Sequence, residues 1–167
     1  MAPSGRFRLR GEGIRFARAA VPVLALCVVL ASCADPARER FERSEKALLE
    51  QKMDTALAGY RSIPKEHPQS RYAPAALLRQ GDLFGSYYRN YPAALEAYES
   101  LVFNYPRATE VPVAHLRTGE ILLQQFVNAP AAVEALELAR KRFPEFERND
   151  EVLLLLAKIA LRERGGA

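Results

Sequence analysis

The feature that most constrains this chain is an internal repeat with a period of 38 residues. Residues 71–106 and residues 109–144 are identical at 13 of 36 aligned positions. The same offset reaches toward the N-terminus, where it relates Tyr60 to Tyr98. A period of about 20 to 50 residues is typical of stacked repeats, in which each unit buries its apolar face against its neighbours. The sequence therefore predicts a solenoid.

Prolines and asparagines mark the ends of helices inside this repeat. Asn90 and Asn128 each stand two positions before a proline, and a capping residue followed by an early proline is a helix start signal. Pro106 and Pro144 follow later in each unit and end that helix, because proline cannot continue it. These signals predict an all-α chain with helices near residues 37–51, 53–66, 72–88, 92–105, 110–126, 130–143 and 149–163.

Two glycines recur inside the first helix of their pairs. At Gly81 and Gly119 a helix loses about 1 kcal/mol relative to alanine. Such a cost is tolerated if the missing side chain lets two helices approach closely. We expect Ala94 and Ala132 to face these glycines, with Phe84 and Tyr98 filling the space beside them.

The spacing resembles that of the tetratricopeptide repeat. That family's pattern ends in alanine, three residues, an aromatic residue and then a proline. The chain has this order at Ala56–Tyr60–Pro68, Ala94–Tyr98–Pro106 and, with leucine as the middle residue, Ala132–Leu136–Pro144. It departs from the pattern in lacking tryptophan, with Leu77 and His115 near that place, and in its period of 38 instead of about 34 residues. The resemblance implies about three helix pairs and a C-terminal capping helix.

The sequence VLLLLAKIAL (152–161) is predicted to be that closing helix. Its ten residues are too few to span a membrane. Asn149 and Asp150 are expected to cap it. Four consecutive leucines touch every side of a helix, so two interpretations stay open: capping of the last repeat alone, or capping combined with contact to a partner.

The N-terminus has the composition of an export signal. Residues 1–18 hold five arginines, and residues 19–34 are uncharged and apolar. The alternative is a membrane anchor, but these sixteen residues would reach only about 24 Å as a helix, whereas the hydrocarbon core needs about 30 Å. A basic segment followed by a short apolar one is typical of a secretory signal.

The sequence Leu30-Ala31-Ser32-Cys33 resembles a bacterial lipobox. The resemblance implies cleavage before Cys33 and lipidation of its thiol, with palmitate among the acyl groups. Alanine instead of aspartate follows Cys33, which points to the periplasmic face of the outer membrane. The expected organisation is a signal peptide over residues 1–32, a lipidated linker over 33–36 and a tetratricopeptide-like domain over 37–167.

Charge and motifs exclude several function classes. The net charge of +4 belongs to the signal segment, because residues 33–167 hold 19 basic and 19 acidic residues. A nucleic-acid partner is therefore not expected. His67 and His115 are isolated, and the chain has neither H-x-x-x-H, C-x-x-C, G-x-S-x-G nor a phosphate-binding loop. We expect no enzymatic activity, no cofactor and no metal.

A candidate partner-binding strip follows from the repeat. In tetratricopeptide proteins the first helices line a concave face that holds an extended peptide or a partner helix. The residues that recur on the side of the first helix away from the glycine are Leu78, Arg79, Asp82, Leu116, Arg117 and Glu120. Either the arginines bind a partner, or Arg79–Asp82 and Arg117–Glu120 are ion pairs on a solvated surface.

The stretch HPQSRYAPAAL (67–77) is similar to sequences in the outer-membrane β-barrel assembly lipoproteins of the BamD type. That resemblance implies a lipid-anchored scaffold that binds protein partners of the cell envelope. The same style occurs in periplasmic tetratricopeptide proteins of the Tol–Pal system. The alternative is thus a subunit of that or another envelope complex, docking through the C-terminal helix.

Overall fold

The computed structural model describes residues 35–165, and this part of the chain is entirely helices and turns. The predicted all-α class is confirmed for these residues, whereas the expected signal segment and Cys33 lie outside them. The helices are α2 (Pro36–Leu49), α3 (Met53–Glu66), α4 (Tyr72–Ser86), α5 (Tyr91–Asn104), α6 (Val111–Gln124), α7 (Ala129–Arg142) and α8 (Asn149–Gly165).

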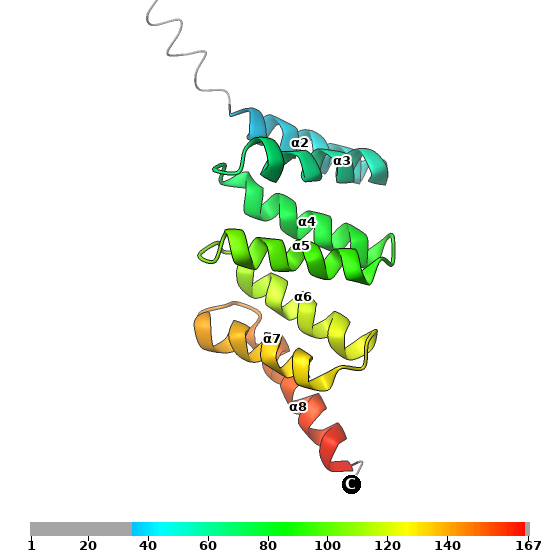
Figure 1. Cartoon of the computed structure of the whole chain (residues 1–167), viewed down its shortest axis with the longest axis vertical. Helices are drawn as coiled ribbons and strands as arrows, with labels where there is room; N and C mark the ends of the chain where they lie inside the picture. The colour runs from blue at the N-terminus through cyan, green and yellow to red at the C-terminus, as the bar shows by residue number, and fades with distance from the viewer. Residues whose placement is uncertain (1–34, 166–167) are drawn as a thin grey trace, which may run out of the picture. The chain divides into compact units, whose positions relative to one another are not determined.

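The seven helices of residues 35–165 form a stack in which sequence neighbours are neighbours in space (Figure 1). Helices α2 and α3, α4 and α5, and α6 and α7 pack as antiparallel pairs, and each pair packs on the next. The core is accordingly a row of three clusters. They centre on Tyr60, on Tyr98 and on Leu136. This is the helix-pair packing of a helical repeat, in which each unit contacts only its neighbours.

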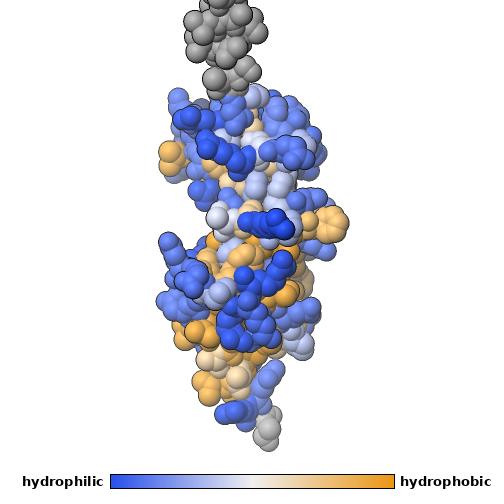
Figure 2. All heavy atoms as spheres, turned by 90° about the vertical axis from the view of Figure 1, so that its left-hand side faces the viewer, coloured by the Kyte–Doolittle hydropathy of each residue, from blue (hydrophilic) through white to orange (hydrophobic). Residues whose placement is uncertain are grey.

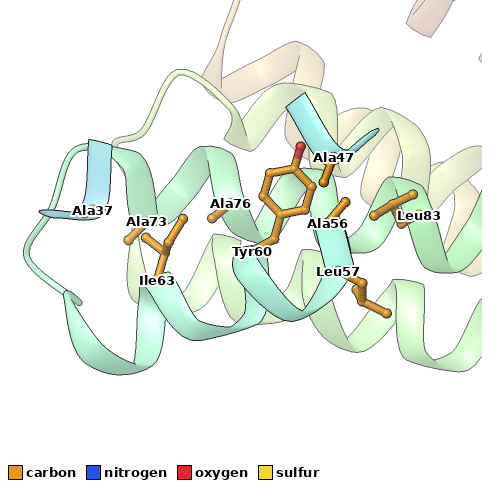
Figure 3. Packing of buried hydrophobic residues seen from close by; sticks show 9 residues of the cluster. All are labelled: Ala37, Ala47, Ala56, Leu57, Tyr60, Ile63, Ala73, Ala76 and Leu83. Atoms are coloured by element: carbon orange, nitrogen blue, oxygen red, sulfur yellow. The ribbon is translucent and has the colours of Figure 1, made fainter. Parts of the chain in front are cut away.

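The first cluster shows how little a pair buries by itself. Tyr60 and Ile63 of α3 lie beside Ala73 and Ala76 of the next pair, and all four are fully buried (Figure 3). The small alanines of α4 let α3 pack closely on it. The first pair therefore completes its core only by stacking on the second.

The predicted helix starts in the second and third pairs are confirmed. The side-chain oxygen of Asn90 accepts a hydrogen bond of 3.2 Å from the backbone N–H of Ala93. Asn128 makes the equivalent 3.2 Å contact with Ala131. These contacts satisfy N–H groups that have no partner within the helix.

The turn inside each pair has a residue with left-handed backbone at the same place of the repeat, although the residue type differs. Gln51, Arg89 and Val127 are 38 residues apart and all have positive φ, at 60°, 54° and 52°. None is glycine, and valine is especially unfavourable there because it is β-branched. In the latter two turns the next residue closes the helix end: Asn90 donates its N–H to the carbonyl of Phe84 at 2.8 Å. The period is thus visible in the backbone itself.

The contact partners of the two recurring glycines differ from the prediction. A Cβ at Gly81 would lie 2.7 Å from Cδ1 of Tyr98, and one at Gly119 would lie 2.7 Å from Cγ of Leu136. The glycines therefore accommodate a large side chain of the second helix. We expected these glycines to face Ala94 and Ala132, but the atoms nearest to them belong to Tyr98 and Leu136. Ala94 lies opposite Gly85 instead, at an ordinary 3.7 Å.

In the first pair the small residue has moved to the second helix. Gly59 of α3 lies against Ser44 of α2, and a Cβ at Gly59 would overlap the Ser44 hydroxyl. Ser44 is buried, and its hydroxyl donates a 2.8 Å hydrogen bond to the carbonyl of Arg40. In the first pair the glycine that allows close packing is thus on the second helix, whereas in the later pairs it is on the first helix.

Helix α8 begins at Asn149, which does not cap it as expected. Its side-chain amide donates to the carbonyls of Phe143 at 3.2 Å and Pro144 at 2.6 Å, so it fastens the end of α7. Val152 and Ile159 are buried against the last pair, which confirms the capping role of this helix. Among the described residues, no helix combines the length and hydropathy needed to cross a membrane.

The glycine contacts yield a first prediction. Gly81→Ala should lower the free energy of unfolding by about 1–3 kcal/mol, because the new methyl group would overlap the Tyr98 ring. Gly85→Ala on the same helix is the matched control. It should raise the free energy of unfolding by roughly 0.4–1 kcal/mol, since its methyl meets only ordinary contacts. Denaturant titration measures both, and equal effects of the two changes would contradict this packing.

Candidate functional site

Polar side chains form a row that joins the first helix of one pair to the first helix of the next. At the contact between the first and second pairs, Glu45 of α2 accepts two hydrogen bonds on one oxygen. One comes from the Tyr60 hydroxyl of α3 at 2.6 Å and the other from Nε of Arg79 of α4 at 2.9 Å. One carboxylate thus connects three helices.

The next pair repeats the step. The Tyr98 hydroxyl of α5 donates to Asp82 of α4 at 2.8 Å. Nε of Arg117 of α6 lies 3.7 Å from the same Asp82 oxygen. Arg117 also binds Glu120 on its own helix at 2.9 Å. We call these two steps the tyrosine–acid–arginine ladder.

The ladder ends at α6 and does not continue to α8. The third pair has Leu136 where the others have tyrosine, and Leu155 of α8 is the residue 38 positions after Arg117. Glu120 is therefore left with its partner on the same helix. The ladder joins α2 to α4 and α4 to α6, and at the C-terminal end apolar packing replaces it.

Both tyrosines remain hydroxyl donors at physiological pH. Burial is the largest of the effects that raise the pKa of Tyr98, followed by the charge of Asp82 and the hydrogen bond to it. Burial and the hydrogen bond to Glu45 raise the pKa of Tyr60 in the same way. The two tyrosine hydroxyls therefore keep the protons that they donate to the ladder carboxylates near neutral pH.

The arginines of the ladder stay accessible. The side chains of Arg79 and Arg117 are 45% and 38% exposed. Partly exposed ion pairs contribute only about 0–1 kcal/mol each, so the ladder orients side chains more than it stabilises the fold. A guanidinium carries five N–H donors, and the ladder contact of Arg79 uses its Nε. The remaining donors can bind an acceptor in solution.

A hollow of about 450 Å³ lies beside the second step of the ladder. Helices α4, α5 and α6 and the α4–α5 turn form it, with Asp82, Ser86, Arg89, Arg117, Glu120 and Gln124 among its lining residues. Its lining mixes both charges with amide and hydroxyl groups, and Ile121 adds an apolar contact. We call this hollow the inner groove. Its donors and acceptors suit the backbone and polar side chains of an extended peptide.

Of the six residues predicted from the repeat, the structure brings four into the ladder: Arg79, Asp82, Arg117 and Glu120. The expected Arg117–Glu120 ion pair is present. Arg79 pairs across the stack with Glu45 instead of with Asp82, which already binds Tyr98.

The two leucines of the predicted strip serve packing. Leu78 is half-buried against the middle cluster. Leu116 is fully buried in the cluster formed by α6, α7 and α8. The first helix of a pair packs both on its own second helix and on the preceding pair. Its apolar face therefore also includes these leucines, which the sequence pattern had placed on the binding surface.

Sequence reasoning did not assign Glu45, Tyr60 or Tyr98 to the site. The 38-residue offset relates the two tyrosines to each other, whereas it does not relate Glu45 to Asp82. Glu45 lies 37 residues before Asp82, because the α2–α3 turn is one residue shorter than the α4–α5 turn. A search at the fixed offset therefore pairs Asp82 with Ser44.

No set of three histidine, cysteine, aspartate or glutamate side chains that could hold a metal ion occurs within residues 35–165. The carboxylates of the ladder bind arginine and tyrosine. Histidine does not line the inner groove. What the groove offers chemically is hydrogen bonding and charge.

His115 lies on the other side of α6, enclosed by α5 and α7. It is only 7% exposed, as is Leu77 at the equivalent position. Its Nε2 is buried without a hydrogen-bond partner. Burial lowers the pKa of His115, and the positive charge of Arg142 lowers it further.

Comparisons with known proteins add no family to this description. The sequence matches no family model and has no significant match among curated proteins. The site is accordingly interpreted from its own geometry.

His115 provides a second prediction. Its lowered pKa means that the folded state favours the neutral form, so stability is present above about pH 6.5 and is lost as the pH falls through the lower folded value. His115→Leu should remove this loss. It should also raise the free energy of unfolding by about 1–3 kcal/mol at neutral pH, since an unpaired buried nitrogen disappears. Denaturant unfolding at pH 7.5 and pH 5 tests both effects, and an unchanged pH dependence would assign the loss to another group.

Proposed function

We propose that this chain is a lipid-anchored periplasmic protein that holds a protein partner in the inner groove, and that the partner belongs to outer-membrane protein assembly. The observation that carries the proposal is the ladder beside the groove, where half-exposed arginines are oriented by neighbouring helices. The proposed assignment to the tetratricopeptide-like class is supported by helix pairs in which a first-helix glycine receives a large second-helix side chain.

Binding in the groove would use the ladder as a preorganised surface. Arg117 already contacts Asp82 and Glu120, so its guanidinium is held in place before a partner arrives. Binding a partner then costs less side-chain entropy than it would if the arginines were mobile. Carbonyl or carboxylate groups of an extended segment fit the arginines, and backbone N–H groups fit Asp82 and Glu120.

The proposed anchor gives a third prediction. If Cys33 is the first residue of the mature protein, the intact mass should equal that of residues 33–167 plus acyl groups. Several acyl chains make the attachment stable, because one chain alone binds membranes only marginally. Cys33→Ser should abolish the acyl mass and release the protein from the membrane fraction. An unmodified Cys33 in the wild-type protein would overturn the anchor.

Partner capture in the groove is the fourth prediction. Arg117→Glu, which changes a residue lining the inner groove, should lower the amount of cross-linked partner recovered from membranes at least about tenfold, a change that corresponds to one or two charged hydrogen bonds. Arg79→Glu, which changes the first step of the ladder outside the groove, tests whether the partner extends along the ladder. Arg61→Glu on α3, outside the inner groove, is the matched control and should leave recovery unchanged. Circular dichroism melts check that every variant remains folded.

The identity of the captured proteins decides between the two candidate functions. Barrel-assembly components in the cross-links support the first. The second candidate, a subunit of a Tol–Pal-type or other envelope complex, is favoured by the exposed leucines of α8, Leu153 and Leu154. It requires that Leu154→Glu release the protein from its complex, whereas the groove variants leave it bound.

A further inference from the structure

Helix α8 occupies the place of a first helix in a further pair. Counting 38 residues from α6 aligns Ala157 with Gly119 and Leu154 with Leu116. The helix packs on the preceding pair through Val152 and Ile159, as a first helix does. A small residue thus stands at the position where, in the earlier pairs, a second helix makes its closest contact.

The face of α8 around Ala157 is exposed. On α6 the equivalent face receives α7, with Leu136 packed onto Gly119. On α8 the side chains of Leu153, Leu154 and Leu161 are 53%, 55% and 68% exposed. Spacings of one, four and eight residues place them on one side of the helix with Ala157 between them. In Figure 2, hydrophobic side chains gather toward the C-terminal end of the stack.

Two pairs of positions on this face match across Ala157, whereas Leu154 has Ala160 as its counterpart. Seven positions out from it stand Asp150 on one side and Arg164 on the other. Four positions out stand Leu153 and Leu161. In an antiparallel helix pair with Ala157 at the crossing point, each of these residues lies opposite its counterpart on the other helix. Opposite charges then meet at both ends, and leucines meet on both sides of the centre.

We propose that a second copy of this chain covers the face, with the two α8 helices packed antiparallel about a two-fold axis at Ala157. A two-fold interface is self-complementary: if one residue contacts another across it, the reciprocal contact also forms. The Asp150–Arg164 arrangement meets this condition, which a face built for an unrelated helix need not meet. Antiparallel packing also places the two helix dipoles in opposite directions.

The size of the face predicts the strength of the dimer. A helix of 17 residues is about 25 Å long, and one helix from each copy makes an interface at the low end of the range for specific complexes. The dimer should therefore dissociate on dilution. A symmetric dimer would leave the inner grooves of the two copies on separate stacks, so it goes beyond the proposed partner binding and does not depend on it.

Charge exchange at the ends of α8 tests the arrangement. Sedimentation equilibrium of the full chain in a mild non-ionic detergent should show a monomer–dimer equilibrium. Asp150→Arg and Arg164→Asp should each weaken dimerisation about tenfold, because each variant sets like charges against each other at both ends of the pair. The double variant restores opposite charges at both ends and should recover most of the wild-type affinity.

Two further variants separate the interface from its alternatives. Ala157→Glu should abolish the dimer without lowering the melting temperature, since Ala157 is exposed. Arg162→Glu, on the side of α8 roughly 140° around the helix from Ala157 at 3.6 residues per turn, is the control and should leave dimerisation unchanged. A monomer at every concentration would overturn the proposal, as would a dimer that survives Ala157→Glu, a failure of the double variant to recover, or occupation of the face by another protein.

Discussion

In the second and third pairs a large side chain of the second helix packs onto a glycine of the first helix, and the arrangement of the stack there depends on this contact. Tyr98 lies on Gly81, which fixes the separation and register of α4 and α5. Asp82 is the next residue after Gly81, so the same ring that fills the gap carries its hydroxyl to that carboxylate. Arg117 of the following pair then meets Asp82. One apolar contact thereby positions both the neighbouring helix and the polar row.

Much of the fold could be predicted because each repeat contains residues that mark where its helices begin and end. The starts at Asn90 and Asn128 were fixed by side-chain caps that a sequence displays directly. Contacts were harder to predict, since an offset shows which residues are equivalent but not which way they point. Ala94 was assigned to the wrong glycine for this reason. The arginines of the site were recognised, whereas Glu45 was missed because a turn one residue shorter moved it out of register.

The ladder and the inner groove depend on stacking between pairs. Glu45 and Arg79 come from different pairs, as do Asp82 and Arg117, so neither step exists within an isolated unit. A ligand in the groove would touch α4 and α6 together and would favour their stacked arrangement. Binding and the stacking of repeats are therefore linked in free energy.

The row of three separate clusters has a consequence for how the protein comes apart. In a domain with a single hydrophobic core, unfolding of one element exposes the core that all the other elements share. Here the cluster around Tyr60 shares few contacts with the cluster around Leu136, because each pair meets only its neighbours. Local unfolding can begin at a terminal pair and stop at the boundary with the next pair, which stays folded. The protein would then pass through shortened, still folded forms that keep an intact middle pair.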